Sequence, residues 1–221
     1  GRNRRRFRPG RSVRVVTDVQ APGMDLTSLW YLLAGWIICV SAGYGVAAAL
    51  LPRSWLRDRV VLAPLFGAAT IILLAGAASY AGLSMGTAAP SVLASAWVLS
   101  VGGVLVSRVR TRSAPTNIAV AAWTHGLGVC AALGVVAGAV VYRAWNPYSD
   151  AFTYISIGDY LQHHSYFDRA VPTPTEPLLT QMALYQRFGF RMGSNFLLAF
   201  FTALFRAQYA FDVYMPVLAQ I

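Results

Sequence analysis

The sequence predicts an all-α membrane protein: a polytopic bundle of transmembrane helices with an extracytoplasmic loop that carries an interfacial helix. Two observations predict this class. Of the 221 residues, 57% are hydrophobic and only 12% are charged, whereas soluble domains carry about a quarter charged residues. The apolar residues also gather in four runs that are long enough, or nearly long enough, to cross a bilayer. A water-soluble fold of this composition would expose large apolar patches.

Residues 1–27 form a basic tail ahead of the first apolar run. Every basic residue of the chain is Arg, and seven of them lie in the first 14 residues. The tail has no apolar periodicity, which predicts disorder or contact with a membrane surface. Its charge lies beside a span and not on a folded domain, so it does not indicate nucleic-acid binding. Met24 allows a second interpretation, in which translation starts there and the tail is not made.

Residues 28–142 hold the four predicted transmembrane helices. The first covers about 28–51 and ends at Pro52, and the second covers about 60–83. The third, about 88–106, is the shortest, and its Gly102 and Gly103 would allow close helix approach. The fourth covers about 118–142. The spans offer little chemistry, because Cys39, Cys130 and His125 are each better explained as packing or hydrogen-bonded residues.

Residues 143–190 are too polar to span a bilayer and too long for a tight turn. They predict a loop with a helix over about 151–167 that suits a membrane interface. Apolar character returns in residues 191–221, breaks at Arg206 and then resumes. We interpret this last part as one or more returning transmembrane segments of a longer protein.

The Arg residues of the loops predict the orientation. The loops 52–59 and 107–117 carry three Arg each, and the turn 84–90 carries none. Cytoplasmic loops are enriched in Lys and Arg, so this distribution places the turn and the 143–190 segment outside. Arg without Lys, with abundant Ala, Gly and Val, suggests a GC-rich bacterial genome, and therefore a multi-pass protein of the bacterial cytoplasmic membrane.

Short motifs in the polar loop carry a family resemblance. Asp150-Ala-Phe-Thr-Tyr154 is followed by a helix and by Tyr166-Phe167, and Gly189-Phe-Arg191-Met-Gly193 leads into an apolar helix. This pattern resembles the first extracytoplasmic loop of the GT-C superfamily, which are multi-spanning glycosyltransferases that use lipid-phosphate sugar donors. The resemblance covers residues 145–214, about a third of the chain. Family members usually have this loop after the first span and often have paired acids, where this chain has four spans and Ser149-Asp150.

The resemblance implies a site in the loop. Asp150 would be the general base that takes the proton of the acceptor hydroxyl. Substrate contacts would come from Tyr154 and from guanidinium groups that suit a phosphate, namely Arg169, Arg187 and Arg191. Acidic and His residues could assist or bind a divalent metal, a possible cofactor that the sequence does not otherwise specify; these are Asp159, His163, His164, Asp168 and Glu176.

Each of these residues also has a simpler interpretation. Asp150 stands where a helix N-cap would stand, and His163 and His164 suit a solvated helix end. Arg187 and Arg191 flank a returning span, where Arg is ordinary, and Arg169 beside Asp168 would form a surface pair.

Three functions remain in view at this point. The first is a GT-C-like enzyme that moves a sugar from a polyprenyl-phosphate-linked donor to a cell-envelope acceptor, with membrane lipid and the donor as partners and no nucleic acid. The second is a transporter or flippase for envelope precursors, which predicts intramembrane charge or broken helices. The third is a non-catalytic membrane subunit whose loop docks a partner.

Overall fold

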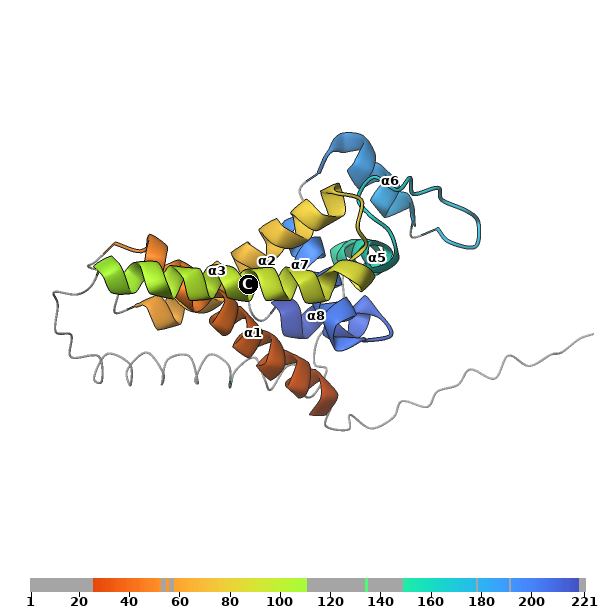
Figure 1. Cartoon of the computed structure of the whole chain (residues 1–221). Coiled ribbons are helices and arrows are strands. Elements are labelled where there is room, and N and C mark those ends of the chain that lie inside the picture. The colour runs from red at the N-terminus through yellow and green to blue at the C-terminus, as the bar shows by residue number, and fades with distance from the viewer. Residues whose placement is uncertain are drawn as a thin grey trace, which may run out of the picture.

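The computed structural model describes residues 26–52, 55, 58–110, 134, 149–177, 179–190 and 192–218. In these residues the chain is helical without a β-strand, apart from an isolated bridge between Thr173 and Glu176. Three long helices form a bundle, and four shorter helices gather at one end of it (Figure 1). The all-α part of the predicted fold is therefore confirmed for the described residues.

The long helices are α1 (Leu26–Leu50), α2 (Arg59–Tyr80) and α3 (Met85–Arg110). All three are long and apolar enough to cross a membrane. At about 1.5 Å per residue even α2 measures about 33 Å, which exceeds a bilayer core of about 30 Å. Their outward faces expose apolar side chains such as Leu73, Val98 and Val109, as a lipid-facing surface would. Three of the four predicted spans are thus found as helices, and the fourth, 118–142, lies outside the described residues.

The third helix is longer than the sequence predicted. It runs from Met85 to Arg110 over 26 residues, whereas the apolar run predicted a span over about 88–106. Ser84 makes the earlier start possible, because its carbonyl oxygen accepts hydrogen bonds from the backbone N–H groups of Thr87 (3.2 Å) and Ala88 (3.0 Å). Pro90, the sixth residue of α3, has no N–H to donate, so the helix lacks one hydrogen bond there.

Glycines set the spacing within the bundle. A Cβ added at Gly45 of α1 would overlap the Ser100 carbonyl of α3, and one at Gly103 would overlap the Gly45 carbonyl. Gly43 and Gly67 hold α1 and α2 together at similarly close range. Small residues let helix backbones approach in this way. The prediction for Gly103 is confirmed, whereas Gly102 meets nothing within 4 Å.

Two short apolar helices follow at the end of the chain. They are α7 (Gly193–Phe205) and α8 (Ala210–Leu218). Arg206 separates them in a left-handed conformation (φ 53°), and the Ala207 N–H donates to the Thr202 carbonyl at 3.0 Å to close the turn. The break predicted at Arg206 is therefore confirmed. Residues 195–202 are buried, so α7 is the central helix around which α2, α3, α5 and α8 pack.

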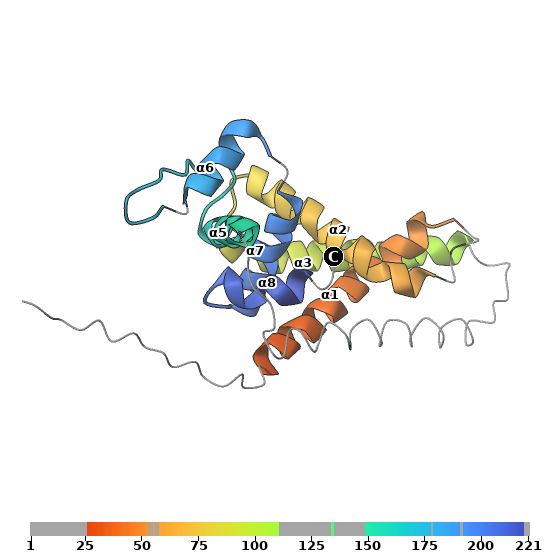
Figure 2. The same ribbon diagram turned by 180° about the vertical axis from the view of Figure 1, so that it is seen from behind.

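The remaining helices are α5 (Ser149–His163) and α6 (Leu179–Phe188). Both lie at the end of the bundle where α2 ends and α3 begins, and the view from behind shows the same arrangement (Figure 2). We expected the helix now identified as α5 to be interfacial, with polar faces. It is more enclosed than that, with residues 155–158 and 160–162 buried, because it packs against α6, α7 and α8. It also ends at His163, four residues earlier than predicted.

Candidate functional site

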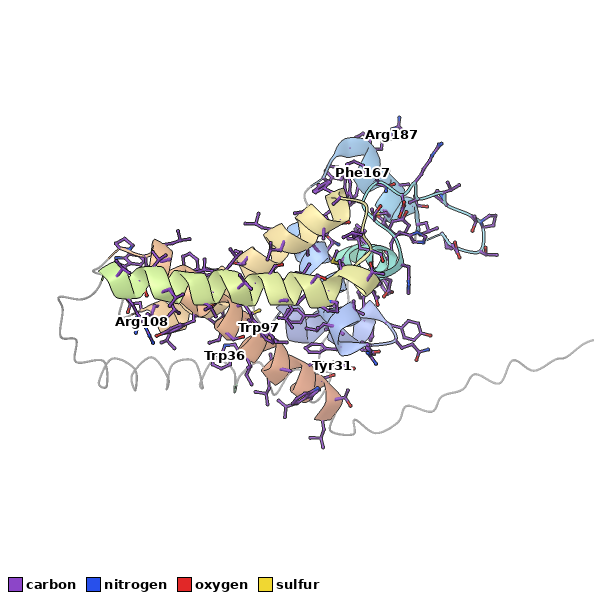
Figure 3. The ribbon with its side chains drawn as sticks, viewed as in Figure 1. Tyr31, Trp36, Trp97, Arg108, Phe167 and Arg187 are labelled. Atoms are coloured by element: carbon purple, nitrogen blue, oxygen red, sulfur yellow. The ribbon has the colours of Figure 1, made fainter. Side chains whose placement is uncertain are left out.

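The charged and polar side chains of the sequence-predicted site lie in residues 149–190, which we call the polar segment. Figure 3 shows Phe167 and Arg187 of this segment at one end of the molecule and Arg108 of α3 at the other. The site residues are therefore separated from the basic end of α3 by the length of the bundle.

Asp150, the predicted general base, is the second residue of α5. Its backbone is helical, and its side chain lies outside the described part of the structure. Tyr154, one turn later, is half-buried and packs against the hydrophobic core. Its backbone carbonyl accepts a hydrogen bond from the Asn195 Nδ2 at 3.3 Å. The structure thus gives Tyr154 a packing role beside the start of α7.

Asp159 connects α5 to α8. Its Oδ1 accepts hydrogen bonds from the backbone N–H of Ala210 at 2.6 Å and from the Gln162 Nε2 at 3.1 Å. Ala210 is the first residue of α8, so the carboxylate caps that helix from another element. Burial raises the pKa of Asp159, and the nearby Asp212 also raises it, while the Ala210 hydrogen bond and His163 lower it. This carboxylate has a structural partner that explains its position.

Asp168 closes the turn after α5. Its Oδ2 accepts a hydrogen bond from the Ser165 N–H at 2.6 Å and lies 4.0 Å from the His164 Nδ1. The Tyr160 hydroxyl donates to the Asp168 carbonyl at 2.6 Å, and the Tyr160 ring stacks on His164 with 4.5 Å between centroids. Burial and the nearby Asp168 charge raise the pKa of Tyr160, although its hydrogen bond with Gln186 lowers it. The cluster fixes the turn and leaves Asp168 partly exposed to solvent.

Gln186 of α6 braces the same turn. Its Nε2 donates to the carbonyls of Tyr166 (2.7 Å) and Asp168 (2.6 Å), and its Oε1 accepts from the Ala170 N–H at 3.1 Å. Gln186 was not among the residues predicted from the sequence. A single Gln on an amphipathic helix carries no signal of its partners, since they lie 16 to 20 residues away in the chain.

The other predicted site residues stand apart from these clusters. Arg169, Glu176 and Arg187 are exposed, and His163 is exposed at the end of α5. Arg191 lies outside the described residues. Among the residues that the structure describes, no three His, Cys, Asp or Glu side chains gather in a group that could hold a metal ion. The structure therefore brings Asp159 near His163, and Asp168 near His164, as pairs without a third ligand.

Asn195 is a second residue that was not among the site residues predicted from the sequence. It is fully buried, and its Oδ1 is a buried acceptor that has no hydrogen-bond partner within the described structure. Buried polar atoms are normally paired. The signal was present in the sequence, because Asn195 is an amide in an otherwise apolar run.

An apolar groove of about 430 Å³ lies between α1 and α3, and its lining includes Trp36, Tyr44 and Val101. Its two serines are occupied: the Ser100 hydroxyl donates to the Ser41 carbonyl at 2.7 Å, and the Trp97 Nε1 donates to the Ser41 hydroxyl at 3.0 Å. The groove can thus take up an apolar group, but its serines are not placed for catalysis.

Searches among protein-family models, curated proteins and solved structures found no match to this chain, so the candidate site rests on its residues and their geometry.

Proposed function

We propose that the protein is a GT-C-like membrane glycosyltransferase, which moves a sugar from a polyprenyl-phosphate-linked donor to a cell-envelope acceptor at the outer face of the bacterial cytoplasmic membrane. One observation carries the proposal. The polar segment folds onto one end of three apolar helices, with Asp150 in the first turn of α5 and with Arg169 and Arg187 exposed in the same segment.

The chemistry of the transfer requires two kinds of group. A carboxylate takes the proton from the acceptor hydroxyl as the new glycosidic bond forms, and cationic groups hold the phosphate that leaves. Asp150 is the candidate base that the family resemblance implies, and the carboxylates of Asp159 and Asp168 are already engaged by backbone N–H groups. Arg169 and Arg187 are candidates for the phosphate, since guanidinium binds phosphate oxygens in pairs.

The arrangement also supports the proposed orientation. Arg108 and Arg110 end α3 at the opposite end from the polar segment. By the positive-inside rule the basic end faces the cytoplasm, so the polar segment faces outward, where lipid-linked donors present their sugars to envelope acceptors.

Replacing Asp150 with Asn tests the proposal. Purified protein in lipid vesicles would be given radiolabelled polyprenyl-phosphate hexose or pentose donors together with envelope glycan acceptors. The Asp150→Asn variant should insert normally and lose transfer, and the Thr175→Ala variant, changed at an exposed loop position of the same segment, should retain it. Full transfer by Asp150→Asn would remove this carboxylate from the mechanism.

A transporter or flippase is the second candidate, and the break between α7 and α8 favours it. Discontinuous helices mark substrate sites in many transporters. The same vesicles separate the two functions: a flippase moves a fluorescent lipid-linked sugar across the bilayer intact, whereas a glycosyltransferase releases the polyprenyl phosphate.

A further inference from the structure

The outward face of α6 exposes large apolar side chains beside polar ones. Four residues at helical spacing are exposed on this face, namely Thr180, Leu184, Arg187 and Phe188. Leu184 is 39% exposed and Phe188 is 60% exposed. The opposite face carries the buried Met182 and the bonded Gln186, so α6 is held on the protein by one side only.

Further aromatic side chains extend this face. Phe190, two residues beyond α6, is 52% exposed, and its ring lies 5.7 Å from that of Phe188. Phe167 is 68% exposed and lies 5.7 Å from the ring of Tyr80. Gln186 ties the turn that carries Phe167 to α6 through the carbonyls of Tyr166 and Asp168.

Tyr80 indicates the depth of these aromatic side chains relative to the long helices. It is the last residue of α2, a helix that is long and apolar enough to cross a membrane. Aromatic residues at the ends of spans lie at headgroup level, and Phe167, in contact with Tyr80, lies at the same depth. Through Gln186 and the turn after α5, α6 is therefore held beside the end of a candidate span.

We propose that α6 and the turn after it form an anchor that inserts into the headgroup region of the membrane, with Leu184, Phe188, Phe190 and Phe167 among the acyl chains and Arg187 against lipid phosphate. Interfacial helices combine such aromatic and Leu side chains with basic residues. Arg187 suits this position, because its guanidinium lies 5.6 Å from the centre of the Phe188 ring and can reach phosphate while the ring is buried. The anchor would hold the polar segment close to the bilayer. It does not depend on glycosyl transfer.

Spin labels at single cysteines test the anchor. Cys39 and Cys130 would be replaced by Ala, and Leu184→Cys, Phe188→Cys and, as a control, Thr175→Cys would be labelled in nanodiscs of phosphatidylethanolamine and phosphatidylglycerol. Thr175 is exposed in the loop before α6. Collision rates with lipid-soluble oxygen and with a water-soluble nickel chelate report the depth of each label.

In the anchored protein, the labels at 184 and 188 collide severalfold less with the nickel chelate, and more with oxygen, than the label at 175. Equal nickel accessibility at 188 and 175 would overturn the proposal. Protection from nickel without a gain in oxygen collisions would also overturn it, because the labels would then lie against protein, such as a second copy of the chain. Neither outcome depends on sugar transfer, so failure of the anchor and failure of the proposed enzyme are distinguishable.

Discussion

The carboxylate of Asp159 should stabilise the fold by capping α8, and its replacement measures that contribution. Asp159→Ala removes the acceptor for the Ala210 N–H and for the Gln162 side chain. Asp159→Asn keeps an oxygen of the same reach, and Asn caps helices about as well as Asp. The two variants therefore separate the hydrogen bonds from the charge.

The magnitude follows from the two bonds. Loss of a helix cap costs about 0.5–2 kcal/mol, and loss of a further partly exposed hydrogen bond costs about 0.5–1.5 kcal/mol. We expect Asp159→Ala to lower the free energy of unfolding by about 1–3 kcal/mol, and Asp159→Asn to lower it by less than about 1 kcal/mol.

The raised pKa of Asp159 makes the free energy of unfolding depend on pH. Burial favours the protonated carboxyl in the folded state, so the folded protein binds this proton more tightly than the unfolded chain does. The stabilisation from protonation is present below the ordinary Asp pKa of 3.8 and is lost as the pH rises through the folded pKa. The Asp159→Asn variant should lack this contribution to the pH dependence of the free energy of unfolding.

Unfolding in mild detergent, followed by circular dichroism as SDS or urea is added, provides the measurement at several pH values. A variant Asp159→Ala as stable as the original protein would refute the capping role. An Asp159→Asn variant as unstable as Asp159→Ala would show that the charge, and not the cap, holds α8.

Two further substitutions test the packing and the turn. Gly45→Leu should disrupt the bundle, because its side chain would overlap the Ser100 backbone, and the free energy of unfolding in detergent should fall by about 3 kcal/mol. Gly102→Leu should be tolerated, because a side chain at this position meets open space. Equal losses of stability in the two variants would contradict the observed glycine packing. Gln186→Leu should cost about 1–3 kcal/mol, since it leaves the Ala170 N–H and the Tyr166 carbonyl without this partner and removes one of the two donors to the Asp168 carbonyl. A faster proteolytic cut in the turn after α5 would report this loss, while an unchanged rate would show that Gln186 is not the brace.

The apolar elements could be predicted from the sequence because their signal is local. Runs of apolar residues located α1, α2 and α3, and the single charge of Arg206 located the break between α7 and α8. The early start of α3 was not predicted. It depends on the Ser84 carbonyl, which accepts hydrogen bonds from two backbone N–H groups ahead of Pro90, and the sequence does not show these bonds.

The candidate site was less predictable because its contacts are not local. Asp159 bonds to Ala210, 51 residues further along the chain, so no spacing rule could assign it as a cap and not a metal ligand. The partners of Gln186 are equally remote. Asp150 was chosen from a motif, and it is the second residue of α5, inside the first turn and not at the N-cap position that the sequence suggested.

The shortness of α7 has a consequence for how the protein is assembled. Thirteen residues make about 20 Å of helix, which is less than the thickness of the hydrocarbon core, so α7 would be a poor substrate for independent insertion by the translocation machinery. Its buried surface is formed largely by contacts with α2, α3 and α5. We therefore expect α7 to pack into place late in folding, once the earlier helices have docked. The turn at Arg206 does not oppose this step, because the N–H groups of Arg206 and Ala207 are paired within the chain.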